Sequence, residues 1–140
     1  MATSGSMQVE LLSPSRVMTR VSADRVTVPG INGDLGILPS HTALVSELGV
    51  GVITVSGGEL SEQQQFFVAG GYVEVSAGKV TVLADTVEKR SEIDVARAEK
   101  SKQRALEILS KRDGEVDYSR AQAALKRAEQ RLAFASAKKH

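Results

Sequence analysis

Four arginines are the residues of this chain whose type and spacing could do chemistry. Arg97 and Arg104 are seven residues apart, which places both on one face of a helix, and Arg127 and Arg131 are one helical turn apart. A guanidinium group stays charged and can hold the oxygens of a phosphate through two parallel hydrogen bonds. The same spacing also fits a solvated helix face, on which ion pairs between residues four apart contribute only about 0.3–0.5 kcal/mol each. Spacing alone favours the solvated face.

Two amphipathic segments would have to position these arginines. Residues 92–109 have helical periodicity, and Ser91-Glu92-Ile93-Asp94 has the form of a capping box in which Ser91 accepts the amide hydrogen bond of Asp94. Gly114 breaks this helix, and a second helix follows it. Because alanine buries little apolar area, we expect a hairpin whose helices approach closely but hold each other weakly. The residues predicted to line its facing stripes are Val95, Ala98, Lys102, Ala105, Ile108 and Leu109 on the first helix, and Ala121, Leu125, Ala128, Leu132 and Ala135 on the second.

The chain before residue 88 is rich in valine, glycine and threonine, arranged in short alternating runs between turn residues. The runs that suit strands are "QVELL", "VMTRV", "RVTVPG", "GVGVITV", "QFFVAGG", "YVEVSAG" and "KVTVLAD". Gly57-Gly58 and Ala77-Gly78 are predicted as hairpin connections. The core candidates are Phe66, Phe67, Val68, Val73, Val75, Val80, Val82 and Leu83.

The predicted fold class is therefore α+β. Residues 7–87 should form an antiparallel β-sandwich, and residues 88–140 an antiparallel α-helical hairpin. Residues 1–6, "MATSGS", are predicted to be a disordered start or a remnant of expression.

The two predicted parts differ in charge. Residues 1–87 have four basic and eight acidic residues, a net charge of −4, whereas residues 88–140 have fourteen and nine, a net charge of +5. Such a split suggests different partners for an acidic body and a basic tail. The tail is too balanced in sign and too poor in aromatic residues to predict nucleic-acid binding. No apolar run approaches the ~18 residues of a membrane-spanning helix, so no direct membrane insertion is expected.

No set of residues predicts catalysis or a metal site. The chain has no cysteine and only two histidines, His41 and the terminal His140, which excludes a disulfide and a thiolate zinc site. "GINGDLG" (residues 30–36) departs from the dinucleotide-binding pattern, and "SAGKV" (residues 76–80) lacks the earlier glycine and the hydroxyl of a phosphate-binding loop. A Ser-His-Asp triad would lack a nucleophile elbow. We interpret His41 as a structural or surface loop residue, and the chain as no enzyme by itself.

Several segments together resemble one family. "VPGINGDLGILPSHTALVSELGVGVITV", "FFVAGGYVEV" and "KVTVLADTVEKRSEIDVARA" are similar to the epsilon subunit of bacterial and chloroplast F-type ATP synthases. "DGEVDYSRAQAALKRA" follows in the place of that family's second C-terminal helix. The resemblance covers nearly the whole chain from Met7. One departure is Ala43, since family members commonly carry proline two residues after the loop histidine.

The resemblance implies a non-catalytic rotor subunit, peripheral to the cytoplasmic face of the bacterial plasma membrane. Its sandwich would bind the gamma subunit and rest on the membrane c-ring, with Gly33, Asp34 and His41 as candidate c-ring contacts. It would help to couple proton flow to ATP synthesis. Its hairpin would either fold against the sandwich or extend along gamma towards the alpha and beta subunits and inhibit ATP hydrolysis. A weak alanine seam suits such a switch, because neither packing should be very stable.

The resemblance also implies ATP as a regulatory ligand, with no required cofactor and no metal. "IDVARA" (residues 93–98) matches the I/L-D-x-x-R-A motif of family members that bind ATP in the folded hairpin. Carried over residue by residue, the candidate ATP site is Glu88, Ile93, Asp94, Arg97, Ala98, Arg104, Arg127 and Arg131. Two other classes of protein stay open on the sequence: a free-standing ATP sensor, which would not bind gamma, and a β-sandwich adhesion module, which would bind neither.

Overall fold

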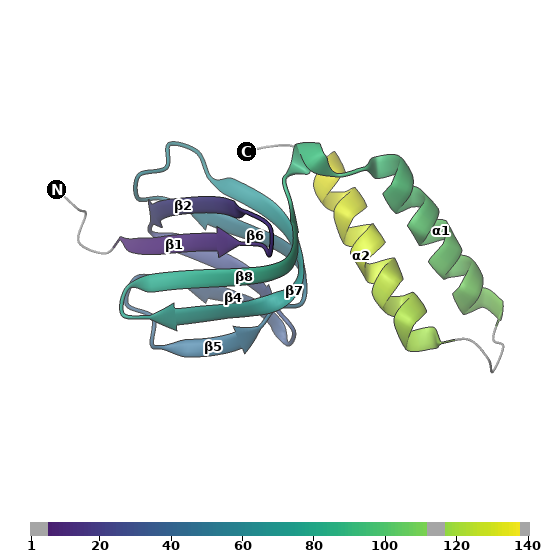
Figure 1. Cartoon of the computed structure of the whole chain (residues 1–140), viewed down its shortest axis with the longest axis horizontal. Helices are drawn as coiled ribbons and strands as arrows, with labels where there is room; N and C mark the ends of the chain where they lie inside the picture. The colour runs from purple at the N-terminus through teal and green to yellow at the C-terminus, as the bar shows by residue number, and fades with distance from the viewer. Residues whose placement is uncertain (1–5, 112–116, 138–140) are drawn as a thin grey trace.

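A strand-rich body with a helical hairpin at one end makes up this protein (Figure 1). The computed structural model describes residues 6–111 and 117–137. The predicted start segment (apart from Ser6) and the break at Gly114 lie outside the described residues. The strands are β1 Met7–Leu12, β2 Val17–Ala23, β3 Arg25–Gly30, β4 Gly33–Ile37, β5 Leu44–Glu47, β6 Val50–Ser56, β7 Gln64–Ser76 and β8 Lys79–Glu88. They are followed by the 3-10 turn η1 Arg90–Glu92 and the helices α1 Val95–Lys111 and α2 Tyr118–Ser136.

The strands are hydrogen-bonded in the order β2-β1-β8-β7-β6-β3-β4, and β5 also pairs with β7. All the pairs are antiparallel except β1 with β8, which is parallel and which the sequence pattern did not predict. β6 pairs with the first half of β7, and β5 with the second half. Since one long strand serves both halves, the sheet folds over on itself. The predicted α+β class, a β-sandwich followed by two helices, is confirmed.

β7 was predicted as two strands, "QFFVAGG" and "YVEVSAG", but is one strand of 13 residues. Gly70 and Gly71 lie at the change from β6 to β5, with φ of 75° and 119°. A Cβ atom on Gly71 would collide with the backbone of Leu83 on β8, so this position needs glycine. β4 and β5 were not predicted. Their sequences, "GDLGI" and "LVSE", are too short and too poor in alternating apolar residues to stand out.

The main core lies between the layers of the sandwich and consists of large aliphatic side chains and one phenylalanine. It includes Met7, Val9, Leu11, Val26, Val28, Ile37, Leu48, Ile53, Val55, Phe66, Val68, Val73, Val75, Val80 and Val82. Leu83 was predicted in this core but is 55% exposed. Its neighbours Val82 and Ala84 point inwards, and alternate residues of a strand face opposite sides, so Leu83 faces out.

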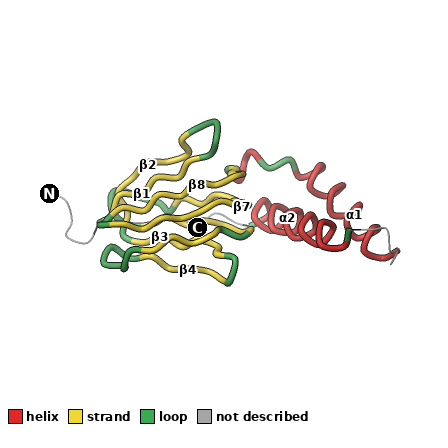
Figure 2. The backbone as a smooth tube through the Cα atoms, turned by 60° about the horizontal axis from the view of Figure 1, so that its bottom comes forward, coloured by secondary structure: helices red, strands yellow, loops and turns green. Residues whose placement is uncertain are grey.

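A second buried cluster, here called the docking cluster, joins the hairpin to the sandwich. It consists of Phe67, Ala69, Ile93 and Phe134, with Val50, Val52 and Ala135 packed against it. Phe67 was predicted in the sandwich core, but its side chain lies on the opposite face of β7 from that of Phe66 and is covered by the hairpin. α2 packs against β6 and β7, and both views show it beside the end of the sandwich, with the far ends of the helices projecting away (Figures 1 and 2).

The two helices meet through alanine, as predicted. Ala98 and Ala105 of α1 and Ala121 and Ala128 of α2 are buried. The remaining predicted stripe residues are partly buried, except Val95, which is 52% exposed. Val95 is the first residue of α1.

The predicted cap of the first helix is wrong. α1 starts at Val95, and the carboxylate of Asp94 accepts the hydrogen bond of the Arg97 amide at 3.0 Å, so Asp94 is the N-cap and not Ser91. Ile93 is extended, with φ −72° and ψ 122°, and its side chain is buried in the docking cluster. Because burial of Ile93 holds the chain extended there, the helix cannot begin at residue 92.

Candidate functional site

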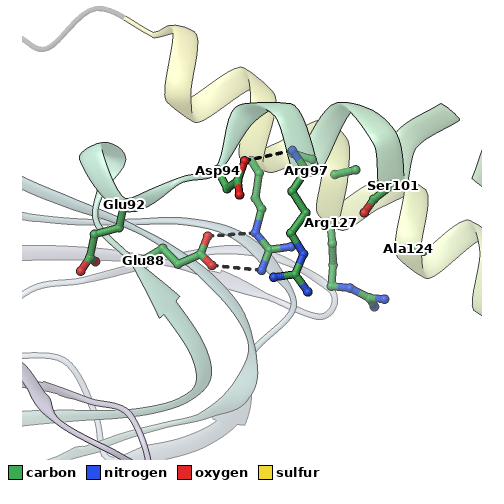
Figure 3. A pocket seen from close by; sticks show the side chains of 10 residues that line it. Glu88, Glu92, Asp94, Arg97, Ser101, Ala124 and Arg127 are labelled. Atoms are coloured by element: carbon green, nitrogen blue, oxygen red, sulfur yellow. Dashed lines mark hydrogen bonds and ion pairs between the residues drawn. The ribbon is translucent and has the colours of Figure 1, made fainter. Parts of the chain in front are cut away.

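A pocket of about 350 Å³ lies where the two helices meet the end of β8 (Figure 3). It is lined by Glu88, Glu92, Asp94, Arg97, Ala98, Ser101, Ala124, Arg127, Ala128 and Arg131. Glu88 comes from the last position of β8, and the three arginines come from the first turn of α1 and from the second half of α2. The pocket therefore exists only while the hairpin lies against the sandwich.

Arg131 is held on the sandwich by two contacts. Its Nε and terminal nitrogen donate to the two carboxylate oxygens of Glu88 at 2.9 and 3.3 Å. Its guanidinium carbon lies 4.6 Å from the centre of the Phe67 ring. Both partners of the ion pair are about a quarter exposed, which makes the pair stronger than a fully solvated one.

Arg97 and Arg127 enter the same pocket from the two helices (Figure 3). Within residues 6–111 and 117–137, no hydrogen bond or ion pair reaches the guanidinium group of either one. The Asp94 carboxylate beside them is engaged as the cap of α1. The guanidinium groups of Arg97 and Arg127 are therefore available to a ligand in the pocket.

The carboxylates of the pocket already have cationic or amide partners. Glu92 binds Arg16 through two bonds of 2.8 Å and accepts the backbone amide of Lys89 at 2.8 Å. The Lys89 amide, and then the Arg16 guanidinium, lower the pKa of Glu92 below its ordinary value. Glu88 is paired with Arg131 and Glu92 with Arg16, so Arg97 and Arg127 are left beside the one carboxylate of Asp94, an excess of one positive charge. The pocket can thus accept an anion, and guanidinium groups converging from two helices suit the several oxygens of a polyphosphate.

The described residues include no group of three or more histidine or acidic side chains that could hold a metal ion. None of the helices within residues 6–111 and 117–137 is both long and apolar enough to cross a membrane.

The structure brings six of the eight predicted ATP-site residues together: Glu88, Asp94, Arg97, Ala98, Arg127 and Arg131. The other two lie elsewhere. Ile93 is buried in the docking cluster, and Arg104 lines an adjoining groove between the helices, which shares Ser101 and Ala124 with the pocket. Arg104 can therefore reach only a ligand long enough to extend along the helices.

Four lining residues were missed by the sequence analysis: Glu92, Ser101, Ala124 and Ala128. Ser101 is four residues after Arg97, Ala124 is three residues before Arg127, and Ala128 is three residues before Arg131, so helical spacing could have found these three. Glu92 could not be found in this way, because the capping box had been assigned to the wrong residues.

Gly33, Asp34 and His41 lie around β4. Gly33 and Asp34 are exposed at the tight turn from β3, where Gly33 has a φ of 124°. His41 is partly buried in the loop after β4; its backbone amide donates to the Leu38 carbonyl at 2.9 Å, and its Nδ1 lies 2.7 Å from the Thr42 carbonyl oxygen. Gly33 and Asp34 are the first two residues of β4, and His41 follows the last one, Ile37, so they lie at opposite ends of this strand.

Known proteins share both parts of this chain. Residues 6–90 match the family described as "ATP synthase, Delta/Epsilon chain, beta-sandwich domain", and residues 91–136 match "ATP synthase, Delta/Epsilon chain, long alpha-helix domain". The ATP synthase epsilon chain of Moorella thermoacetica is 41% identical over 132 residues, which are 94% of this chain and 98% of that relative.

Two solved structures have the same fold. One is a chain of the Euglena gracilis mitochondrial ATP synthase (OSCP/F1/c-ring), with a TM-score of 0.79 and 22% identity over 91% of this chain and 80% of the other. The second is a chain of the Tetrahymena thermophila mitochondrial ATP synthase (central stalk/c-ring), with a TM-score of 0.62 and 18% identity over 93% of both chains. With two family matches end to end and a relative of full length, this chain belongs to the epsilon chain family of the ATP synthases.

Proposed function

We propose that this chain is a central-stalk subunit of an F-type ATP synthase that couples rotation to the c-ring and regulates ATP hydrolysis through its hairpin. It is a subunit and not itself catalytic. The observation that carries the regulatory role is the pocket between hairpin and sandwich, in which the guanidinium groups of Arg97 and Arg127 converge without a protein partner in the described residues. ATP is the polyphosphate that such an enzyme complex makes and hydrolyses.

ATP in this pocket would favour the folded hairpin. Arg97 and Arg127 come from different helices, and Glu88 and Arg131 join α2 to the sandwich. A ligand that touches all of them binds well only while the parts are together, so its affinity difference between folded and extended forms shifts the population. The extended form, freed from the sandwich, would reach the alpha and beta subunits and inhibit hydrolysis.

Calorimetry tests the ATP site. Loss of a hydrogen bond to a charged group costs ~1.5–3 kcal/mol, so we expect Arg97→Ala and Arg127→Ala each to weaken ATP binding by at least about tenfold. Arg120→Ala is the matched control, since Arg120 is an exposed arginine of the same helix as Arg127 but lines only the adjoining groove. No binding at millimolar ATP, or equal affinity in all these proteins, would exclude the proposed site.

An apolar stripe on the outer face of the sandwich supports the proposed binding of gamma. It crosses five strands. Tyr72 on β7 lies diagonally from Val45 on β5 and directly opposite Leu83 on β8. On the other side of β8, Leu83 pairs with Leu12 on β1, and Leu12 pairs with Val17 on β2. Val45, Tyr72 and Leu83 are 68%, 56% and 55% exposed. Aligned apolar side chains on five neighbouring strands are typical of an interaction surface.

The rim of this outer stripe is acidic. Glu74 lies opposite Val45, Glu47 lies opposite Tyr72, and Asp85 follows Leu83 on the same face of β8. All three carboxylates are exposed. A partner with an apolar centre and basic surroundings would fit, and salt should slow its association.

Co-purification with gamma tests this surface. Leu83→Asp puts a charge at the centre of the stripe and should abolish the complex, whereas Thr27→Asp on β3, at a partly buried position away from the stripe, is a control for strand stability. For the c-ring, Asp34→Cys should cross-link to the polar loop of subunit c, because Asp34 is exposed at the β3–β4 turn. Cross-links only to gamma or beta would mean that the sandwich is oriented differently.

A further inference from the structure

We propose that two reciprocal arginine–phenylalanine clasps hold the hairpin on the sandwich, and that only one of them responds to a ligand in the pocket. This inference rests on the proposed function in one respect, that the hairpin can leave the sandwich. In the first clasp an arginine of the hairpin lies on a phenylalanine of the sandwich. In the second an arginine at the end of the sandwich lies on a phenylalanine of the hairpin.

The Arg131 clasp is part of the pocket. Arg131 of α2 stacks on Phe67 of β7 and binds the carboxylate of Glu88. Arg131 and Glu88 both line the pocket, so a polyphosphate there competes with Glu88 for the same guanidinium donors or binds beside them. The strength of this clasp must therefore change when the pocket is filled.

The Arg90 clasp lies outside the pocket. The guanidinium carbon of Arg90 is 4.1 Å from the centre of the Phe134 ring, and its Nε donates to the Phe134 carbonyl at 2.8 Å. Its terminal nitrogen donates to the side chain of Gln65 on β7 at 3.0 Å. Arg90 faces a different groove, lined by residues 63–66 and 89–91 and by Met18. A ligand between the two helices does not meet it.

The Arg90 contact also satisfies the end of α2. The last carbonyls of a helix have few partners within the helix and carry its negative dipole end. Phe134 is two residues from the last residue of α2, and its carbonyl accepts a long hydrogen bond of 3.3 Å from the Ala137 amide and a shorter one of 2.8 Å from Arg90. A cation that reaches this carbonyl from the sandwich side gains energy only while α2 is docked. Arg90 therefore acts as a positioning residue: it fixes the end of α2 near Arg131, and with it the helix that carries Arg127.

The two clasps should have separable effects on the docking equilibrium. Without ligand, the ratio of docked to open hairpin depends on both. A ligand that binds only the docked form multiplies this ratio by a factor set by its concentration and its intrinsic affinity. Arg90 contributes to the ratio of docked to open hairpin but not to the factor by which the ligand changes it. Arg131 contributes to both.

A single cysteine can report this equilibrium, because the chain has none of its own. Ala69 is 8% exposed in the docking cluster, so in an Ala69→Cys protein a thiol reagent reacts at a rate proportional to the open fraction, however small that fraction is. Ala84 is 2% exposed in the sandwich core, so Ala84→Cys reports opening of the sandwich itself. Lys89→Ala is the matched control, since it removes the same charge from the adjacent exposed position.

In the Ala69→Cys background without ATP, Arg90→Ala should raise the labelling rate roughly tenfold, through loss of a cation–π contact and a hydrogen bond from a charged group. Lys89→Ala should leave the rate unchanged. Saturating ATP should then slow labelling of the Arg90→Ala protein by the same factor as the parent, whereas in Arg131→Ala this factor should fall towards one.

An unchanged rate in Arg90→Ala would overturn the proposal, and so would an equal rise at Ala84→Cys, which would mean loss of the sandwich fold. An altered ATP factor in Arg90→Ala would show that the clasps are not separable. If ATP has no effect even on the parent, the ATP site fails while the Arg90 result without ATP still stands on its own.

Discussion

The sandwich and the hairpin bury different kinds of side chain, and this difference supports the proposed division into a rigid sandwich and a movable hairpin. Leu11, Ile53 and Phe66 in the sandwich core are at most 5% exposed and bring large apolar areas out of water. The seam between the helices is made of alanine, and the hairpin holds to the sandwich through one small cluster and the two arginine clasps. We therefore expect most of the stability to lie in the sandwich and, under the proposed function, the change of conformation to lie in the hairpin.

The largest expected effect is in the sandwich core. Leu11→Ala deletes most of a fully buried side chain between the layers, and such changes cost about 2–5 kcal/mol. Ala105→Gly in the helical seam should cost only about 1 kcal/mol, mainly through helix propensity. Urea unfolding followed by circular dichroism measures both. Equal losses from the two substitutions would contradict the division into a rigid and a movable part.

A truncation sharpens the comparison. A chain that ends after Lys89 keeps all of β8 and the main core but uncovers Phe67, so we expect it to fold alone with a moderate loss of at most about 3 kcal/mol. It should still bind gamma, because the outer stripe lies on β1, β2, β5, β7 and β8. An unfolded product would mean that the hairpin is part of the sandwich's own stability. Phe67→Ser in the same truncation controls for aggregation through the uncovered ring.

How well the sequence predicted the structure also differs between the two regions. In the sandwich, alternation of apolar residues found the strands with long runs, and the Ala77-Gly78 turn, in which both residues have positive φ, was confirmed. Alternation could not find β4 and β5, and it could not reveal that β1 and β8 are parallel, since pairing partners far apart in the chain leave no local pattern.

In the hairpin, helical spacing predicted the alanine seam, whereas the arginines of the pocket were predicted from the family resemblance. Spacing alone had grouped Arg97 with Arg104, which lines the adjoining groove. It could not find the clasps, because Arg90 with Phe134 and Arg131 with Glu88 are contacts between residues more than 40 positions apart. The start of α1 was misplaced because a tertiary contact, burial of Ile93, outweighed a local capping pattern. In both regions, local patterns of apolar residues predicted strands and helices, whereas contacts between residues far apart in the chain could not be predicted.

The smallest expected effect compares two acidic residues, one in each region. Glu10 on β1 binds Arg20 at 2.6 Å and Lys79 at 3.3 Å, and these partners lower its pKa, the Arg20 hydrogen bond most. Glu92 in η1 has its pKa lowered first by the Lys89 amide and then by Arg16 on the sandwich. A carboxyl with a lowered pKa in the folded state contributes stability that is present above its ordinary value of 4.5 and is lost as pH falls through the lowered value.

Both carboxyls lie at the surface, so the effects should be small and should weaken in salt. The two substitutions should nevertheless affect different events, one the unfolding of the sandwich and the other the opening of the hairpin. Glu10 joins β1 to β2 and β8 within the sandwich, so Glu10→Gln should lower the free energy of sandwich unfolding near pH 7, with no difference from the parent once pH is below the lowered pKa of Glu10. Glu92 links η1 to Arg16 between β1 and β2, so Glu92→Gln should instead raise the labelling rate of Ala69→Cys over the same pH range and leave Ala84→Cys unchanged. If Glu92→Gln affects both cysteines alike, the linker and the sandwich unfold as one unit, and the boundary between the rigid and movable parts must lie beyond η1.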